Sequence, residues 1–388
     1  MIWLLINCRE KYKLNWQNFN FTGNEPTFMK KAILVLFVLF VFLQLAHGQK
    51  KDEKFKNIIQ ISANPVENQQ KTGTCWSFAT SSFLESEILR KGKGEYDLSE
   101  MFFVRQAYLQ KAKKYLLYHG HANFGEGGQA HDVMNVIREF GIMPESEYTG
   151  KPINTEIHDH GKMEEELIRF IAKTNNGFNK KRAEEWEEQF NQILDTYLGK
   201  LPQEFGIKGQ TYSPLGFTAF LAINPDDYLE FTSFTHHSFY ERIDLEIPDN
   251  WSHDKYINVP IKELVEIIDS SLYRGYTVCW DGDTSEKSFN HRSGIATLDS
   301  GVADYPTARQ NTFLSREMTD DHLMHITGIA EDENGEQFYR TKNSWGTDKS
   351  EYEGYLYMSV PYVKLKTIAI LVHKNAVPQS IMNKIERP

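Results

Sequence analysis

A cysteine, a histidine and an asparagine of the kinds found in thiol-based catalytic triads occur in this 388-residue chain. Cys75 opens an apolar, helix-like run, His325 precedes an apolar, strand-like run, and Asn343 follows eighteen residues later. A thiolate attacks a carbonyl carbon, an imidazole moves the proton, and a carboxamide holds the imidazole in position. The order cysteine, histidine, asparagine along the chain predicts nucleophilic catalysis, in which Cys75 attacks, His325 shuttles the proton and Asn343 orients His325.

Two of the catalytic roles, the base and the oxyanion donor, each have a second candidate residue nearby. His322 lies three residues before His325, but only His325 is followed directly by the apolar run 326–329. Attack on a carbonyl builds negative charge on its oxygen, which needs preorganised hydrogen-bond donors. Gln69 and its neighbour Gln70 each carry an amide that can serve beside the backbone N–H of the nucleophile. The residues alone favour His325 and leave the choice of glutamine open.

Local patterns place these residues on a helix and on neighbouring strands. Apolar residues recur at helical spacing over 75–90, so Cys75 stands at a helix N-terminus, whose partial positive charge favours a thiolate. A turn signal at 332–335 predicts a hairpin, which places His325 and Asn343 on adjacent strands. Further helices are expected over residues 100–115, 130–140 and 261–274, and strands over residues 277–280, 325–330, 337–341, 354–360 and 367–372.

The N-terminus carries a targeting pattern. Residues 29–31 form a short positive region, residues 32–46 are apolar, and small residues precede Gln49. This pattern is typical of a secretory signal peptide over 29–48, with an uncleaved membrane anchor as the rival interpretation. Residues 1–28 are an upstream extension. We therefore expect an exported protein, periplasmic, cell-surface or secreted, without stable membrane insertion after cleavage.

The remaining chain divides into a helical part and a β-rich part. We expect an α+β fold with a helical lobe at 49–255, which carries the nucleophile, and a β-rich lobe at 256–388, which carries the histidine and asparagine. Charged helices with a thin apolar face at about 160–200 form an inserted arm that packs on the body or on a second subunit. A homo-oligomer is compatible with this arm.

Composition is ordinary for a soluble globular protein, with 40% hydrophobic and 25% charged residues. The net charge of -10 argues against a nucleic-acid partner, because phosphate binding needs a basic surface. With Cys8 in the upstream extension, only Cys75 and Cys279 remain in the mature chain. A disulfide framework is therefore excluded, and a single bridge between these two is the alternative to a free nucleophile.

The local sequences around these residues resemble the papain superfamily of cysteine peptidases. The matching segments are Cys75-Trp76, Leu98-Ser99-Glu100, Gly127-Gly128, Asn343-Ser344-Trp345-Gly346 and Gly354-Tyr355. The resemblance covers about residues 60–360 and implies a papain-like two-lobed fold. It also implies a peptide or protein substrate that is cut through an acyl-enzyme.

The resemblance assigns roles to further residues. It implies that Gln69, which lies six residues before the nucleophile, is the oxyanion donor in preference to Gln70. It supports His325 as the base through the strand that follows it. It further implies that the backbone of Gly127-Gly128 holds the substrate as an added strand, and that Trp345 shields the histidine–asparagine bond from water.

Several details favour the bleomycin hydrolase and aminopeptidase C branch of the superfamily. Thr72 replaces a disulfide-forming cysteine of papain-type enzymes, and both the arm and residues 278–283 resemble that branch. Its members are usually cytosolic, and their C-terminus enters the cleft, whereas the tail at 382–388 does not match the known endings. The expected function is a cysteine-type, aminopeptidase-like peptidase; the alternative is a catalytically silent or acyl-transferring protein that binds peptides in the same cleft.

No metal or organic cofactor is expected, although a reducing environment keeps the thiol active. Histidines occur in close pairs that lack a cysteine or carboxylate at metal-binding spacing. We therefore expect surface or loop positions for the following pairs: His119 and His121, His158 and His160, His236 and His237.

Overall fold

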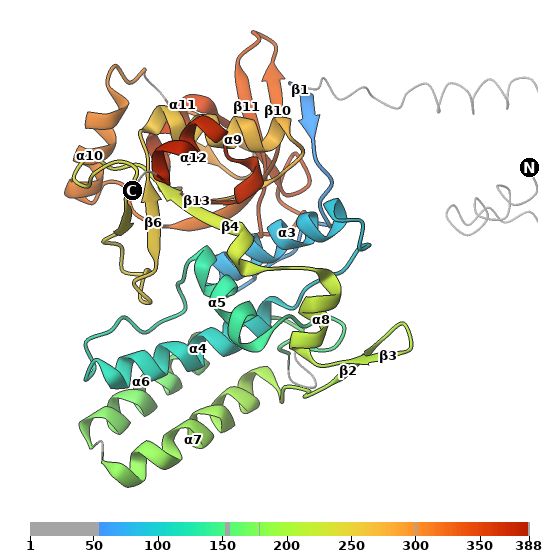
Figure 1. Ribbon diagram of the computed structural model, residues 1–388, viewed down its shortest axis with the longest axis vertical. Coiled ribbons are helices and arrows are strands. Elements are labelled where there is room, and N and C mark those ends of the chain that lie inside the picture. Colours follow the sequence, from blue (N-terminus) through green and yellow to red (C-terminus); the bar gives the residue numbers. More distant parts are fainter. Residues whose placement is uncertain (1–53, 152–155, 178, 299–300, 387–388) are drawn as a thin grey trace, which may run out of the picture. The chain divides into compact units, whose positions relative to one another are not determined.

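The computed structural model describes residues 54–151, 156–177, 179–298 and 301–386. The expected signal peptide at 29–48 and the extension at 1–28 lie outside the described residues. Within the described part, a large mixed sheet has a layer of helices on each face, which gives an α+β fold (Figure 1).

The sheet has eleven strands in the order β5-β6-β4-β13-β7-β10-β11-β12-β9-β8, and β1 pairs with β10 as a branch. The strands on the N-terminal side are β1 (Phe55–Gln60), β4 (Tyr228–Thr232), β5 (Arg242–Asp244) and β6 (Lys255–Asn258). Those that follow are β7 (Val278–Gly282), β8 (Phe289–Asn290), β9 (Ile295–Ala296), β10 (His322–Asp332), β11 (Gln337–Lys342), β12 (Tyr355–Ser359) and β13 (Thr367–His373).

Strand β10 is the longest and pairs antiparallel with β1, β7 and β11. The hairpin between β10 and β11 forms at the predicted turn, where the Asp332 carboxylate accepts the N–H groups of Asn334 and Glu336. This turn fixes a register in which His325 lies opposite Lys342.

Alternate residues of the central strands enter two different cores. Cys279 of β7 and Leu323 of β10 face the helices of the first lobe, whereas their neighbours Trp280 and Met324 face the opposite layer. The two faces follow from the two-residue period of a strand. Since both faces are buried, a one-residue error in register would exchange the two sets of side chains.

The first helical layer confirms the expected helices. The Ser99 hydroxyl accepts the N–H of Phe102 at 3.1 Å and so begins one of them, and Gly141 closes another. This layer contains α3 (Cys75–Arg90), α4 (Glu100–Leu117), α5 (Ala130–Phe140) and α8 (Pro214–Leu221), beside the small hairpin of β2 (Phe205–Ile207) and β3 (Gln210–Tyr212). The other elements are α9 (Ile261–Tyr273), α10 (Tyr305–Ser315), α11 (Val360–Lys366), α12 (Gln379–Ile385) and the short turns η2 (Pro225–Asp227) and η3 (Lys374–Ala376).

The expected arm is a helical pair, α6 (Gly161–Asn176) and α7 (Lys180–Leu198), below α4 in Figure 1. Its thin apolar face is buried, with Leu167 and Phe190 fully covered. The arm therefore packs on the body of its own chain. No helix within the described ranges, the arm included, is long and apolar enough to cross a membrane.

The expected boundary between lobes at residue 256 does not coincide with the sheet. Strands β1, β4 and β5 precede that residue and still belong to it. From β1 onward, the described chain passes from the β-rich lobe to the helical lobe at α3 and returns at β4. Strand pairing depends on distant partners, so composition along the chain could not locate these crossings.

Candidate active site

Cys75 is the first residue of α3, and its thiol is half-buried and free. Thr74 precedes the helix without a side-chain capping bond, and the N–H of Ser77 donates to the Thr74 carbonyl at 3.0 Å. The next residue, Trp76, is buried and its indole N–H donates to the Glu126 carbonyl oxygen at 2.9 Å. This bond fixes the start of the helix and thereby the position of the sulfur.

The sulfur of Cys75 meets the beginning of β10. Burial raises the pKa of the Cys75 thiol to about 12, and the backbone N–H groups of Leu323 and Trp76 act against this rise by donating to the sulfur. Leu323 immediately follows His322 in β10. The contact therefore places the start of β10, and His322 with it, beside the nucleophile.

His322 is the histidine that pairs with Asn343. Its Nε2 lies 2.7 Å from the Oδ1 of Asn343, and both side chains are buried. The ring of Trp345 stacks on the imidazole at a centroid distance of 4.6 Å, and His291 contacts the other end of the Asn343 amide. With Nε2 donating to the asparagine, Nδ1 is the ring nitrogen left to accept a proton.

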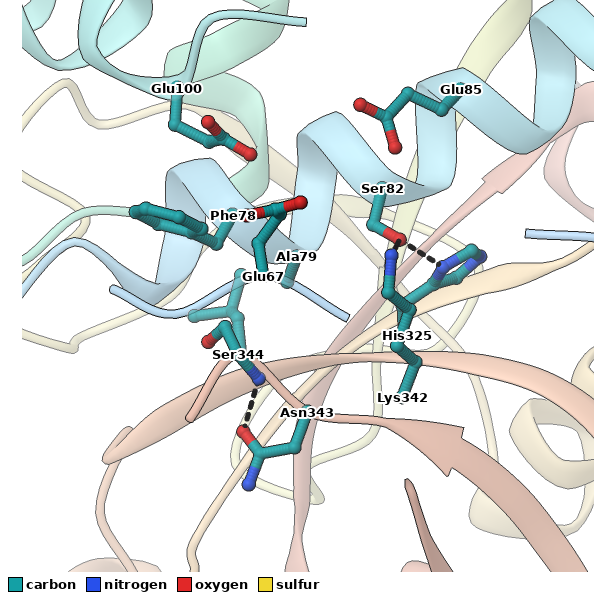
Figure 2. A pocket seen from close by; sticks show the side chains of 11 residues that line it. Glu67, Phe78, Ala79, Ser82, Glu85, Glu100, His325, Lys342, Asn343 and Ser344 are labelled. Carbon is teal, nitrogen blue, oxygen red and sulfur yellow. Dashed lines mark hydrogen bonds between the residues drawn. The ribbon is translucent and has the colours of Figure 1, made fainter. Parts of the chain in front are cut away.

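The prediction of His325 as the histidine oriented by Asn343 is wrong. The Nδ1 of His325 lies 2.9 Å from the hydroxyl oxygen of Ser82 on α3, and the Lys342 ammonium donates to the same oxygen at 2.8 Å (Figure 2). His325 is fully buried. Burial, and then the charges of Lys342 and Arg340, hold the pKa of His325 well below its usual range.

The two-residue period of a β-strand explains why His322, and not His325, contacts Asn343. His322 and His325 are three residues apart in one strand, so their side chains point to opposite faces. Lys342 lies opposite His325 and shares its face, and Asn343 is the next residue along the chain. Strand β10 also begins at residue 322, whereas the predicted strand begins at residue 325. The adjacency of Lys342 and Asn343 therefore distinguishes the histidines only once this register is known.

Gln69 contacts the segment that follows Asn343. Its Oε1 accepts the hydroxyl of Ser344 at 2.7 Å, and one hydrogen of its Nε2 donates to the Thr72 carbonyl at 2.8 Å. The second hydrogen of that nitrogen remains for a ligand. Gln70 differs, because its side chain accepts the backbone N–H of His158. The structure therefore brings Gln69, and not Gln70, to the Asn343 segment.

Gly127 and Gly128 line the other side of the nucleophile. A Cβ at Gly128 would lie 3.0 Å from the ring of Trp76 and 2.6 Å from a carboxylate oxygen of Asp132. A Cβ at Gly127 would lie 2.0 Å from the carboxylate of Asp249. A side chain at either position would meet these groups, so glycine suits both. Gly127 is half-buried and Gly128 is buried.

Three carboxylates that sequence reasoning did not select form an acidic wall near the nucleophile: Asp249, Asp281 and Asp320. Asp281 is 3% exposed, and neither of its carboxylate oxygens has a hydrogen-bond partner among the described residues. It lies opposite Leu323 and Ala369 in the sheet and so shares their face toward α3. The remaining two flank the glycine pair, Asp249 against Gly127 and Asp320 through a 2.9 Å bond from Gln129.

Burial and mutual repulsion favour the protonated forms of the carboxyl groups in the acidic wall. Burial, and then repulsion from Asp320 and Asp249, hold the pKa of Asp281 well above its usual range. Burial, together with repulsion from Asp249 and Asp321, raises the pKa of Asp320 to about 8. Buried carboxylates that repel one another favour a cationic ligand, which removes the repulsion.

A second polar cluster lies beneath α3 and does not face the nucleophile. Glu67, Glu85, Glu100 and Lys342 surround a cavity of about 10 Å³, which His325 also lines (Figure 2). Burial raises the pKa of Glu85 to about 8, although Lys342 acts against the rise. The cluster joins the nucleophile helix to β10 and β11, so His325 belongs to the contact between the lobes.

Comparison with known proteins shows the family of this chain. The peptidase C1-like family matches residues 111–388, which include His322 and Asn343. Aminopeptidase W of Lactobacillus delbrueckii subsp. lactis is 23% identical over 380 residues, which cover 84% of this chain and 85% of that protein. The mitochondrial cysteine proteinase 1 of Saccharomyces cerevisiae is 22% identical over 391 residues, which cover 87% and 80%.

Among solved structures, PepW from Lactobacillus rhamnosis has the same fold. It superposes with a TM-score of 0.69 at 17% identity, over 85% of this chain and 84% of that one. The family match extends over most of this chain and includes the histidine and asparagine of the candidate site. The chain therefore belongs to the peptidase C1-like family, within the papain superfamily of cysteine peptidases.

Proposed function

We propose that this cysteine peptidase removes residues from the free N-terminus of peptides, with Cys75 as nucleophile, His322 as base and Asn343 as the group that orients the base. The 2.7 Å bond between His322 and Asn343, beside a sulfur that receives the N–H of Leu323, is the observation that carries the assignment. The relatives named aminopeptidase W, G and C support the aminopeptidase type.

The reaction follows from these positions. Burial favours the neutral thiol and lowers the pKa of His322 to about 4, although its bond to Asn343 acts against this shift. Transfer of one proton from Cys75 to Nδ1 of His322 creates the thiolate without changing the net charge of the site. The thiolate attacks the carbonyl carbon, and the imidazolium then protonates the departing amine.

The oxyanion that forms during attack needs donors, which Gln69 and the Cys75 backbone N–H provide in this proposal. Water then hydrolyses the acyl-enzyme, with His322 as base for this second step. The Gly127-Gly128 backbone holds the substrate chain as an added strand.

The acidic wall supports action at a free N-terminus. A peptide whose scissile carbonyl meets Cys75 places the groups preceding that carbonyl near Gly127 and Leu323, where Asp249 and Asp281 lie. The α-ammonium group of a substrate is the cation that offsets the repulsion within the wall. An acetylated N-terminus has no charge and leaves Asp281 unpartnered.

The position of the C-terminal helix α12 also supports the acidic wall as the site that binds the substrate ammonium group. Ile381 of α12 is buried in the core that contains α9, and Lys384 forms a 2.6 Å ion pair with Glu263. The tail, as far as it is described, is thus held on α9. We therefore assign recognition of the substrate ammonium group to Asp281 and its neighbours in the wall instead of to a carboxylate on this tail.

The test is mass spectrometry of a ten-residue peptide and its N-acetylated twin after incubation with the reduced chain. We expect stepwise loss from the free N-terminus, resistance of the acetylated twin, and no cleavage by Cys75→Ala. Asp281→Asn should raise KM for the free peptide by roughly 10- to 100-fold, as for loss of a charged hydrogen bond.

The outcomes separate the alternatives. Equal internal cutting of both peptides would show an endopeptidase and remove the role of the acidic wall. If Cys75→Ala retains the wild-type rate, the thiol mechanism is wrong. Transfer of the acyl group to added amines instead of water would show an acyltransferase, and an untouched peptide that still binds would show a silent binding protein.

We further propose that the chain is exported, on the basis of the signal-peptide pattern at 29–48. N-terminal sequencing of the protein from culture medium and cell fractions tests this proposal. A mature N-terminus at Gln49 supports cleavage and export. An intracellular protein that retains residues 29–48 contradicts it.

A further inference from the structure

Two adjacent histidines and a glutamate converge at one point of the surface, away from the residues of the proposed triad. The Nε2 atoms of His236 and His237 lie 3.0 and 2.9 Å from the two carboxylate oxygens of Glu246. The three ligand atoms lie within 4.8 Å of one another. The histidines come from the loop after β4 and the glutamate from the segment after β5, so two separate parts of the chain meet here.

The histidine loop is held in shape by two buried amides. The Asn258 side chain accepts the N–H of Phe234 and donates to three carbonyl oxygens of the loop, including that of His237 at 3.0 Å. The Oε1 of Gln310 accepts the backbone N–H groups of Thr235 and His236. The loop geometry is therefore fixed before any ligand arrives.

The same glutamine also orients one of the rings. The Nδ1 of His236 lies 3.1 Å from Oε1 of Gln310. An amide oxygen only accepts, so Nδ1 carries a hydrogen, and Nε2 is the ring nitrogen that faces Glu246 and that a metal would bind in place of its proton. Metal-binding histidines have this arrangement, in which a second group fixes the tautomer and leaves the ligating nitrogen free.

We propose that His236, His237 and Glu246 bind a zinc ion through two Nε2 atoms and one carboxylate oxygen. Two imidazoles and a carboxylate are a zinc-ligand set, with the fourth tetrahedral position left for water. Zinc bonds of about 2.0–2.1 Å separate neighbouring ligand atoms by roughly 3.3 Å, so the histidine–glutamate spacings of 3.0 and 2.9 Å need only a small expansion. This site is independent of the proposed peptidase function.

A hydrogen-bonded cluster without metal is the competing explanation. In that explanation the Nε2 atoms of the two histidines donate hydrogen bonds to the Glu246 carboxylate. Arg242 lines the adjacent hollow. The side chains of His236 and His237 are each 26% exposed, so an ion reaches them from solvent.

Sequence spacing did not reveal this site, because Glu246 is separated from the histidines by strand β5. A bound ion would tie the loop after β4 to the segment after β5 and thus close one edge of the sheet. We expect zinc to stabilise the folded chain by binding it in preference to the unfolded chain.

The test is equilibrium dialysis of the full chain against zinc chloride, with metal content measured by mass spectrometry. The Cys75→Ala background removes the thiol, which itself binds zinc. We expect one zinc per chain at micromolar concentration and a rise in Tm with zinc. Glu246→Gln, which keeps the shape and one acceptor oxygen but removes the charge, should weaken binding at least tenfold, as should His237→Gln.

His253→Gln is the matched control, because His253 is a nearby exposed histidine that pairs with Asp244 at 3.0 Å and lies outside the trio. It should bind zinc as tightly as the parent. Circular dichroism establishes that each variant is folded. Unchanged affinity in folded Glu246→Gln and His237→Gln, or no bound zinc in the parent at micromolar concentration, would overturn the proposal.

Discussion

At the scale of single residues, the site depends on which of two nearby histidines faces the cleft. His322 has an asparagine, an indole and the nucleophile segment as neighbours, all of which suit a proton shuttle. His325 has a hydroxyl and a lysine, inside a fully buried contact between lobes. The same residue type therefore has two roles within one strand, set by the direction of each side chain.

Substitution of each histidine separates these roles. His322→Ala should lower kcat by a factor of about 10³, because the general base is lost while the cleft remains. His325→Gln keeps an acceptor for the Ser82 hydroxyl and should keep kcat per folded molecule near the wild-type value. The measurement is steady-state hydrolysis of an unblocked peptide, normalised to the folded fraction by circular dichroism.

Asn343 provides a further check of the same assignment. Asn343→Ala should lower kcat with little effect on KM, because it frees the ring of His322 without touching the substrate. The assignment of His322 as the catalytic base is wrong if His325→Gln abolishes turnover in a folded protein while His322→Ala remains active.

At the scale of helices and strands, most of the structure near the nucleophile could be predicted from local sequence. The serine cap before α4 and the glycine after α5 are local signals, and both helices lie where these signals placed them. The choice between His322 and His325 needed the start and register of β10, which are set by β7 and β11 far away in the sequence. Strand β1 and the acidic wall likewise depend on distant neighbours.

Gly141 offers a test of how tightly the end of α5 is constrained. Its φ is +91°, and a Cβ there would lie 2.3 Å from the backbone carbonyl carbon of Pro214. Gly141→Ala combines backbone strain with a clash against rigid backbone, so we expect a loss of more than about 3 kcal/mol of unfolding free energy. Urea denaturation monitored by circular dichroism measures it.

Gly275, just after α9, is the matched control. Its φ is +78°, but nothing lies within 4 Å of a Cβ placed there. Gly275→Ala therefore carries the strain without the clash and should cost only about 1–2 kcal/mol. Equal losses in the two variants would show that the contact between Gly141 and Pro214 does not constrain α5.

At the scale of the whole molecule, many ionisable groups are buried in their neutral forms. Burial raises the pKa of Glu85, Glu145 and Asp320 to about 8 in each case. Burial also lowers the pKa of His158 to about 3 and of His160 to about 4. These two histidines lie in a loop as expected, but the loop is covered. The two sets of groups make stability depend on pH in opposite directions.

Below about pH 6.5 the histidines bind protons in the unfolded chain but stay neutral when folded, so their contribution to stability falls as the solution becomes more acidic. Above about pH 4.5, the ordinary pKa of a carboxyl group, the three carboxyl groups make a contribution of opposite sign, so the two effects oppose each other up to about pH 6.5. Between about pH 6.5 and 8 the three carboxyl groups are ionised in the unfolded chain but still bind protons when folded. The unfolding free energy therefore falls as pH rises through this interval.

Glu145→Gln tests the alkaline side of this prediction. The amide keeps the shape of the side chain and cannot ionise, so the variant should lose less stability than the wild type between pH 6.5 and 8. Urea denaturation at a series of pH values measures the slope, and Glu333→Gln in the exposed β10–β11 turn is a control with the same change of charge. Because Glu145 is only one of three such carboxyl groups, we expect a shallower slope and not a flat line. A wild-type stability that rises from pH 6.5 to 8 would contradict the burial of neutral carboxyl groups on which the acidic wall also depends.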